Sequence, residues 1–144
     1  MHPKEFLQQI DDHRLIAAIG EAERRTSGEI RVHISHRNRP DALAAAQQRF
    51  RKLGMSKTTQ RNAVLIYLAP RSRAFAIIGD TGVHLKCGDA FWQQMMAQLS
   101  SDLKAKPATE ALVAAVRTVG ELLAAHFPPT GEDRNELPNE IDRD

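Results

Sequence analysis

The stretch Ala63–Ala69 constrains the fold most strongly, because all of its residues are apolar. A run of this length is typical of a strand that is buried on both faces of a sheet. Pro70–Arg73 follows as a tight turn, and Ala74–Ile78 is a second apolar run of strand length. We therefore predict a β-hairpin whose first strand lies in the middle of a sheet.

Another strand is indicated by Glu29–Ser35, where apolar and polar residues alternate strictly. This pattern predicts one face in the core and another that is wet or lightly covered. Pro40 and Asp41 open a helix that Gly54 ends. A strand, a helix and the central strand in this order predict a right-handed βαβ unit. The expected apolar stripe of the helix consists of Leu43, Ala46, Phe50 and Leu53.

Helices are expected at both ends of the chain. The first begins at Asp11 or Asp12, since aspartate caps helix N-termini well. The third begins at Asp89, after a glycine-rich break, and the fourth lies between Pro107 and Pro128. The fold class is therefore α/β, with the order α-β-α-β-β-α-α. It has a small mixed β-sheet, made of the βαβ unit and the hairpin, covered by helices on both faces.

Composition excludes several classes of protein. Hydrophobic residues make up 42% and charged residues 26% of the 144 residues, as in an ordinary single globular domain. No apolar run approaches the ~20 residues that span a bilayer, and no signal peptide is recognisable. We therefore expect a cytoplasmic protein. Cys87 is the single cysteine, which rules out an intrachain disulfide and a cysteine-based zinc site.

Charge divides the chain into two parts. We expect a domain over residues 1–127 and an acidic C-terminal extension over residues 128–144. The extension carries six acidic residues against two arginines, while the whole chain has a net charge of +2. Leu137 and Ile141 are its only large apolar residues. Two alternatives stay open: a disordered end, or a segment that docks through Leu137 on the basic body or on a partner.

Several segments together resemble the TPM domain family. The resemblance covers roughly residues 12–127, and its specificity lies in the ordered set. The segments are Glu23–Val32 at a helix-to-strand opening, Phe50–Gly54 at a helix end, Asn62–Tyr67 at the central strand, and the loop Gly79–His84 with the following Asp89.

The resemblance implies two properties that family members show, acid phosphatase activity and, in a plant domain, bound calcium. The chain departs from the family pattern at three positions. Arg61 stands where the family usually has Asp, Ala63 replaces a Gly, and His84 replaces a common Glu. We therefore expect no metal and no cofactor. If calcium is bound, Asp80 and Asp89 are its candidate ligands.

The hairpin places the candidate site residues independently of the family. The end of its second strand lies beside the start of its first, so Asp80 and Asp89 should approach Arg61. Glu29 enters its strand near the same edge. An ion-pair network and a metal site are both open, although calcium prefers six or more oxygen ligands. The predicted binding cluster is Glu29, Arg61, Asn62, Asp80, His84 and Asp89.

Other reactive groups carry less chemistry. Cys87 lies near His84, which could lower the thiol pKa, but a lone cysteine is more often inert. His33 and His36 could bind an anion or form a solvated polar face. No serine carries a nucleophile signature. A basic run could attract phosphates, but it has no interleaved aromatic residues for base stacking, and we expect neither DNA nor RNA as a partner. The run consists of Arg49, Arg51, Lys52, Lys57 and Arg61, with Arg71 and Arg73 on the hairpin turn.

These observations favour a noncatalytic binding or accessory module that engages a protein partner, with peripheral association at a membrane as an option. The first alternative is a metal-assisted acid phosphatase, which rests on the resemblance alone. The second is an anion or nucleic acid binder that uses the basic run.

Overall fold

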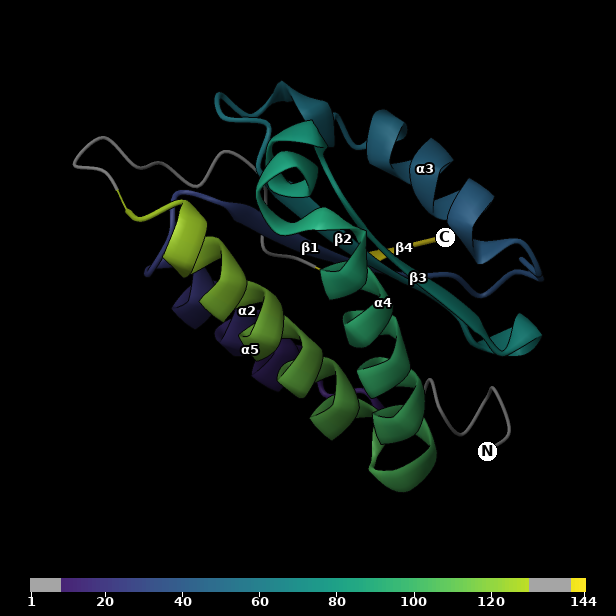
Figure 1. Ribbon diagram of the computed structural model, residues 1–144. Coiled ribbons are helices and arrows are strands. Elements are labelled where there is room, and N and C mark those ends of the chain that lie inside the picture. The colour runs from purple at the N-terminus through teal and green to yellow at the C-terminus, as the bar shows by residue number, and fades with distance from the viewer. Residues whose placement is uncertain (1–8, 130–140) are drawn as a thin grey trace.

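The computed structural model describes residues 9–129 and 141–144. A mixed sheet has the strand order β3-β2-β1-β4 and carries helices on both faces (Figure 1). β1 runs parallel to β2 and β4, while β2 and β3 are antiparallel. The predicted α/β class is confirmed. The elements are α2 (Asp12–Glu23), β1 (Glu29–Ile34), α3 (Ala42–Lys52), η1 (Met55–Lys57), β2 (Ala63–Ala69), η2 (Pro70–Ser72), β3 (Ala74–Gly79), α4 (Thr81–Ala105), α5 (Ala108–His126) and β4 (Asp142–Arg143).

The central hairpin forms as its apolar runs predict. Every residue of β2 is buried, and the β2–β3 register extends from Val64 opposite Gly79 to Ala69 opposite Ala74. The turn is a short 3-10 helix that ends at Arg73 with a left-handed φ of 50°. This hairpin brings the residues before β2 next to those after β3.

Two apolar cores lie on opposite faces of the sheet. The larger is beneath α2, α4 and α5, and it takes Ile66 from β2. The smaller is beneath α3 and contains Phe50 together with Leu65 and Tyr67 of β2. Because neighbouring side chains of a strand point to opposite faces, a continuous apolar run suits a strand between two cores.

The prediction of a wet or lightly covered face on β1 is wrong, because all six residues of the strand are buried. Arg31 is 8% exposed and His33 is 0% exposed. The ring of Tyr67 stacks on His33 with centroids 4.8 Å apart, and β4, a strand that the sequence did not predict, pairs with the outer edge of β1. The alternation reflects a polar buried layer, because a distant segment supplies the polar partners.

The predicted stripe of α3 is partly wrong. Leu43 is 53% exposed, whereas Ala42 is buried and faces the sheet with Ala46 and Phe50. These three residues follow each other at intervals of four, so they lie on one helix face. Asp41 caps the helix by accepting a 3.1 Å hydrogen bond from the backbone N–H of Ala44.

α4 begins at Thr81 rather than at Asp89, which also corrects the prediction. Asp80 is its N-cap, and Gly88 interrupts the helix with a φ of 74°. The glycines around Thr81 predict a loop from the sequence alone. Gly82 instead allows close approach, since a Cβ there would lie 2.3 Å from the carbonyl oxygen of Gln60.

The end of the acidic extension contributes to the sheet. Ile141 packs against the larger core, and Asp142–Arg143 form β4. Leu137, the predicted anchor, lies outside the described residues. No helix in residues 9–129 is both long enough and apolar enough to cross a membrane.

Candidate functional site

The hairpin joins Arg61 to Asp80 in a two-point ion pair. Arg61 Nε lies 2.7 Å from Asp80 Oδ2, and its Nη2 lies 3.0 Å from Oδ1. Asp80 is only 6% exposed, and its Oδ1 also accepts a hydrogen bond from the backbone N–H of Thr81. These hydrogen bonds and the negative charge of Asp80 raise the pKa of Arg61. The pair ties the entry to β2 to the start of α4.

Backbone contacts hold this corner. The backbone N–H of Gly82 donates to the carbonyl of Arg61 at 2.9 Å, and that of Asp80 donates to the carbonyl of Ala63 at 2.9 Å. Arg61 has a left-handed φ of 53°, which is uncommon for a residue with a Cβ. The surrounding backbone therefore imposes this conformation.

The other predicted site residues are dispersed. Asn62 is 2% exposed, and its Nδ2 lies 3.3 Å from the hydroxyl of Ser27. His84 Nδ1 lies 3.9 Å from Asp89 Oδ1, where the carboxylate side chain of Asp89 is 88% exposed. Glu29 is buried at the start of β1. The structure thus brings together Arg61 with Asp80 and His84 with Asp89, but it does not gather the six residues around one point.

Glu29 is close to a second carboxyl group that sequence reasoning missed. Glu23, at the end of α2, accepts a 3.0 Å hydrogen bond from the backbone N–H of Ile30. Burial, followed by the hydrogen bond with Glu29, raises the pKa of Glu23 to about 9. Burial and the contact with Glu29 therefore favour the neutral form of Glu23 well above the pH at which a free glutamate loses its proton. The signal was the Thr26–Gly28 turn, which returns the chain so that β1 starts beside the end of α2.

Calcium does not fit the donors of this edge. Both carboxylate oxygens of Asp80 face the guanidinium of Arg61, and a fixed positive charge repels a divalent ion. Asp89 lies outside the pair in solvent. Residues 9–129 and 141–144 contain no group of three His, Cys, Asp or Glu side chains that could hold a metal ion.

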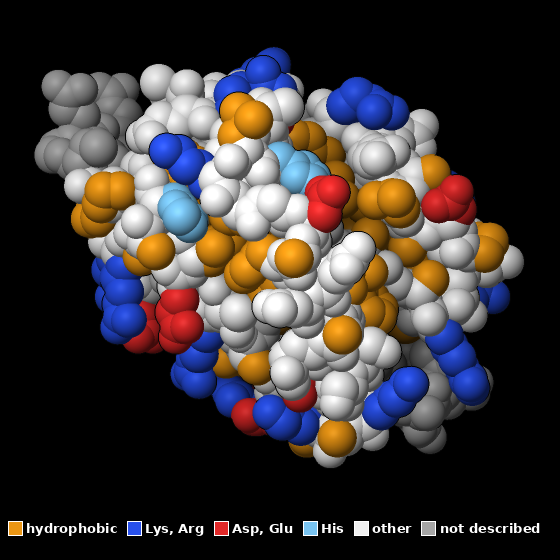
Figure 2. Space-filling model, viewed as in Figure 1, with side chains coloured by type: hydrophobic (Ala, Val, Ile, Leu, Met, Phe, Trp, Pro, Cys, Tyr) orange, Lys and Arg blue, Asp and Glu red, His pale blue; other side chains and the backbone are white. Residues whose placement is uncertain are grey.

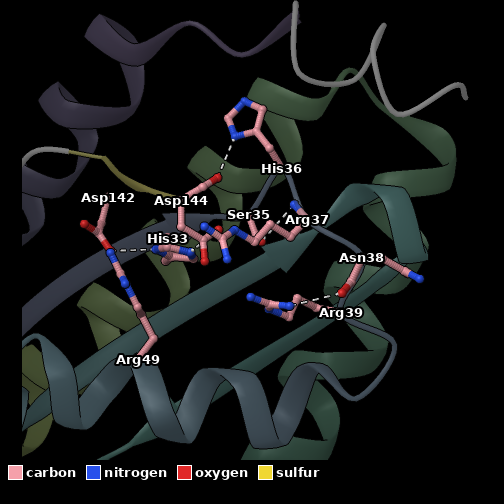
Figure 3. Close-up of polar contacts among 9 residues, drawn as sticks. All are labelled: His33, Ser35, His36, Arg37, Asn38, Arg39, Arg49, Asp142 and Asp144. Carbon is pink, nitrogen blue, oxygen red and sulfur yellow. Dashed lines mark hydrogen bonds and ion pairs between the residues drawn. The ribbon is translucent and has the colours of Figure 1, made fainter.

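A second polar cluster lies at the end of β1, and Figure 3 shows its side chains. Asp142 Oδ2 is 2.6 Å from His33 Nδ1 and 2.7 Å from Arg49 Nε. His33 Nε2 lies 3.3 Å from Asp144 Oδ1, which is an ion-pair distance without the alignment of a hydrogen bond. Two acids of the extension therefore flank one fully buried imidazole.

Both acids of this cluster are stabilised in their charged form. Burial alone would raise the pKa of Asp142, but hydrogen bonds from Arg49 and His33 outweigh it and lower the pKa. For Asp144, burial is again outweighed, here by the Ser35 hydroxyl and by His33, so its pKa is also lowered. The sequence signal was limited to the alternating polar residues of β1 and an acidic end.

A third feature is the outer edge of β3. Among the described strands, only β2 pairs with β3, and Ala74–Gly79 contains no charged residue. Figure 2 shows apolar side chains exposed in a band beside α4, on the side of β3 and α3. At the start of β3 a cavity of about 720 Å³ opens between the η2 turn and the end of α4. Its lining includes Leu68, Pro70, Phe75 and Leu103, with Arg73, Lys104 and Lys106 as basic members.

The remaining candidates contribute little. Burial raises the pKa of Cys87, so proximity to His84 does not produce a reactive thiolate. His33 is buried rather than part of a solvated face, while His36 is exposed. Arg49 and Arg61 of the basic run are engaged by Asp142 and Asp80.

Comparisons with known proteins identify a family model and two similar solved structures. The family model of the TPM domain matches residues 1–122. The NMR structure of BA42 protein from the psychrophilic bacterium Bizionia argentinensis is 34% identical, covers 92% of each chain and has a TM-score of 0.84. The N-terminal domain of cg2496 protein from Corynebacterium glutamicum is 20% identical over 83% of this chain and 74% of that chain, with a TM-score of 0.60, and shows the fold alone. Among curated proteins, none matches the sequence.

Proposed function

Since this chain belongs to the TPM domain family, we propose that it is a noncatalytic binding module that engages a protein partner at the outer edge of β3. The observation that carries the proposal is the uncharged edge strand Ala74–Gly79 beside an apolar cavity with basic residues. The proposal takes the cytoplasm as its setting and requires no cofactor.

An edge strand of this kind invites strand addition. Proteins commonly protect such edges with lysines, prolines or bulges, because unpaired backbone groups accept another strand. Ala74–Gly79 contains neither lysine nor proline. In β-augmentation, the backbone provides affinity and pockets for alternate side chains provide specificity. The cavity at the start of β3 is such a pocket.

Charge and shape define the occupant. Phe75 and Leu103 line the cavity with apolar surface, while Arg73 and Lys104 are exposed and basic. An extended segment that carries a large apolar residue and a nearby acid would match both. An apolar lining with exposed charged residues at its border is typical of protein interfaces, where an apolar anchor is surrounded by a polar rim.

The alternatives draw less support from the geometry. A metal-assisted phosphatase requires positioned cations around the phosphoryl group, whereas Asp80 is paired with Arg61 and Asp89 faces solvent. We therefore expect no turnover of a generic aryl phosphate with calcium or magnesium. Clear hydrolysis that Asp89→Asn removes would favour the phosphatase. An anion binder would use the basic run, but two arginines of this run already have acidic partners.

The proposal is tested with peptides selected from a random library on the purified chain. We expect them to share a large apolar residue close to an acid, and to shift the backbone NMR signals of β3. Lys104→Glu should weaken binding by about tenfold or more, the equivalent of one well-placed charge contact. Arg51→Glu, an equal charge reversal on α3, should leave it unchanged. Peptides that shift no β3 signal, or that tolerate Lys104→Glu, would refute the assignment.

A further inference from the structure

We propose that the end of β1 is a receptor for an extended acidic segment with two aspartates separated by one residue. The chain's own Asp142 and Asp144 fill this receptor in cis, and a protein partner with the same pattern fills it in trans. The site lies at the edge of the sheet opposite to β3. It is therefore independent of the function proposed for the β3 edge.

The first aspartate position is defined by two basic side chains from different elements. His33 from β1 and Arg49 from α3 both contact Asp142 Oδ2, at 2.6 and 2.7 Å. Figure 3 shows Asp142 beside Arg49, with His33 next to both. Because the His33 side chain is fully buried, it cannot exchange Asp142 for water without cost. The receptor therefore demands an acid at this position.

The second aspartate position combines side-chain and main-chain recognition. Asp144 Oδ1 is 3.3 Å from His33 Nε2, and the Ser35 hydroxyl bonds the same carboxylate. The backbone N–H of His36 donates to the carbonyl of Asp144 at 3.1 Å. The spacing of two residues follows from strand geometry, because alternate side chains point to the same face.

The receptor sets a weaker requirement on the residue between the two aspartates. It lies opposite Ile34 in the parallel register, where His33 lies opposite Asp142. In this chain Arg143 occupies the position, and its guanidinium forms a two-point pair with Asp12 on an exposed surface. Ile141, before the first aspartate, packs against the larger core. A partner segment thus needs an apolar residue, an aspartate, a variable residue and a second aspartate.

The receptor and its occupant differ in origin. His33, Ser35 and Arg49 lie within residues 1–122, which match the TPM family model. The occupant, residues 141–144, lies beyond that match. A receptor formed by the family domain is therefore separable from the segment that fills it here. The strand pairing spans only two residues, so the acids contribute much of the recognition.

The test uses the full chain with Asp142→Asn and Asp144→Asn combined, which removes the acids of the internal occupant. The probe is a synthetic peptide of residues 138–144. An occupant on the same chain acts at an effective concentration on the order of millimolar, so the unmodified chain should bind the peptide weakly. We expect the double variant to bind it at least about tenfold more tightly by calorimetry. NMR signals of His33 and Ile34 should shift on binding.

Two controls make the result specific. A peptide with asparagine in place of both aspartates should not bind, and Arg49→Gln introduced into the double variant should reduce affinity about tenfold. If the double variant does not fold, Asp144→Asn alone takes its place. A concentration-dependent dimer of the unmodified chain that excess peptide dissolves would also support the receptor, filled by a second copy. A folded variant that binds no peptide at millimolar concentration would overturn the proposal.

Discussion

The two ends of β1 shift the pKa values of half-buried carboxyl groups in opposite directions. At its start, half-buried Glu23 lies beside Glu29, and its pKa is raised to about 9. At its end, Asp142 and Asp144 face His33, with Arg49 beside Asp142, and their pKa values are lowered. Burial opposes the charged form at both ends, so the difference comes from the neighbours. The comparison teaches that the partner of a half-buried carboxyl group decides whether the group is charged.

The two ends should therefore respond to pH in opposite directions. For Glu23, the folded pKa lies above the reference value of 4.5. Its contribution is fully present below that value and is lost as the pH rises toward about 9. For Asp142 and Asp144, the folded pKa lies below the reference value of 3.8. Their contribution is present above that value and is lost as the pH falls through the folded pKa.

The largest expected effect is at the start of β1. Glu23→Gln keeps an acceptor for the Ile30 N–H and removes the titrating proton. In the unmodified chain the free energy of unfolding should fall between pH 5 and pH 8, and in the variant most of this fall should be absent. At pH 8 the variant should therefore be more stable by on the order of 2–3 kcal/mol. Denaturant melts across this range measure it. The control is Glu21→Gln on the exposed side of α2, which should retain the decline. A Glu23→Gln chain that is less stable at pH 8 would contradict the raised pKa.

The next effect is at the end of β1. Asp142→Asn removes the carboxylate that joins His33 to Arg49, and should lower the free energy of unfolding at pH 7 by about 1–2 kcal/mol. The loss should shrink only as the pH falls below 3.8 and through the lowered pKa of Asp142, where the acid of the unmodified chain becomes protonated. Arg143→Gln breaks only the exposed pair with Asp12 and should cost less than Asp142→Asn. Equal losses in the two variants would show that the strand, rather than the acid cluster, stabilises this end.

Arg61 and Arg73 offer a smaller contrast, because both have a left-handed φ. Arg73→Gly should raise stability by roughly 0.5–1 kcal/mol by relieving the backbone. Arg61→Gly relieves the same strain but breaks the fork with Asp80, so its gain should be smaller or negative. Paired thermal melts decide the order. If Arg61→Gly stabilises as much as Arg73→Gly, the ion pair with Asp80 contributes nothing to stability.

Calcium should have the smallest effect. Asp80 already pairs with Arg61, and residues 9–129 and 141–144 contain no group of three His, Cys, Asp or Glu side chains that could hold a metal ion. Addition of calcium should leave the melting temperature unchanged, because a ligand that binds only the native state would raise it. A rise that Glu29→Gln abolishes would place a cation at the start of β1 and break the comparison between the two ends.

Local patterns determined much of this protein from the sequence alone. The apolar run Ala63–Ala69 predicted a central strand, and the turn after it placed Asp80 near Arg61. Such features follow from periodicity and from the register of a hairpin, which are properties of neighbouring residues. The start of α4 at Thr81 was missed because Gly82 reads as a breaker, whereas close packing against Gln60 requires it.

Only the tertiary structure decided how the polar residues are used. His33 alternates with apolar neighbours whether it meets water or a carboxylate, and its partner Asp142 lies 109 residues away. No local pattern encodes that pairing, because β4 becomes a strand only through the edge of β1 that receives it. The pKa of Glu23 likewise depends on the turn that brings Glu29 beside it. Sequence periodicity determines which side chains are buried on the same face. The charge of a buried group depends instead on its neighbours, which only the complete fold supplies.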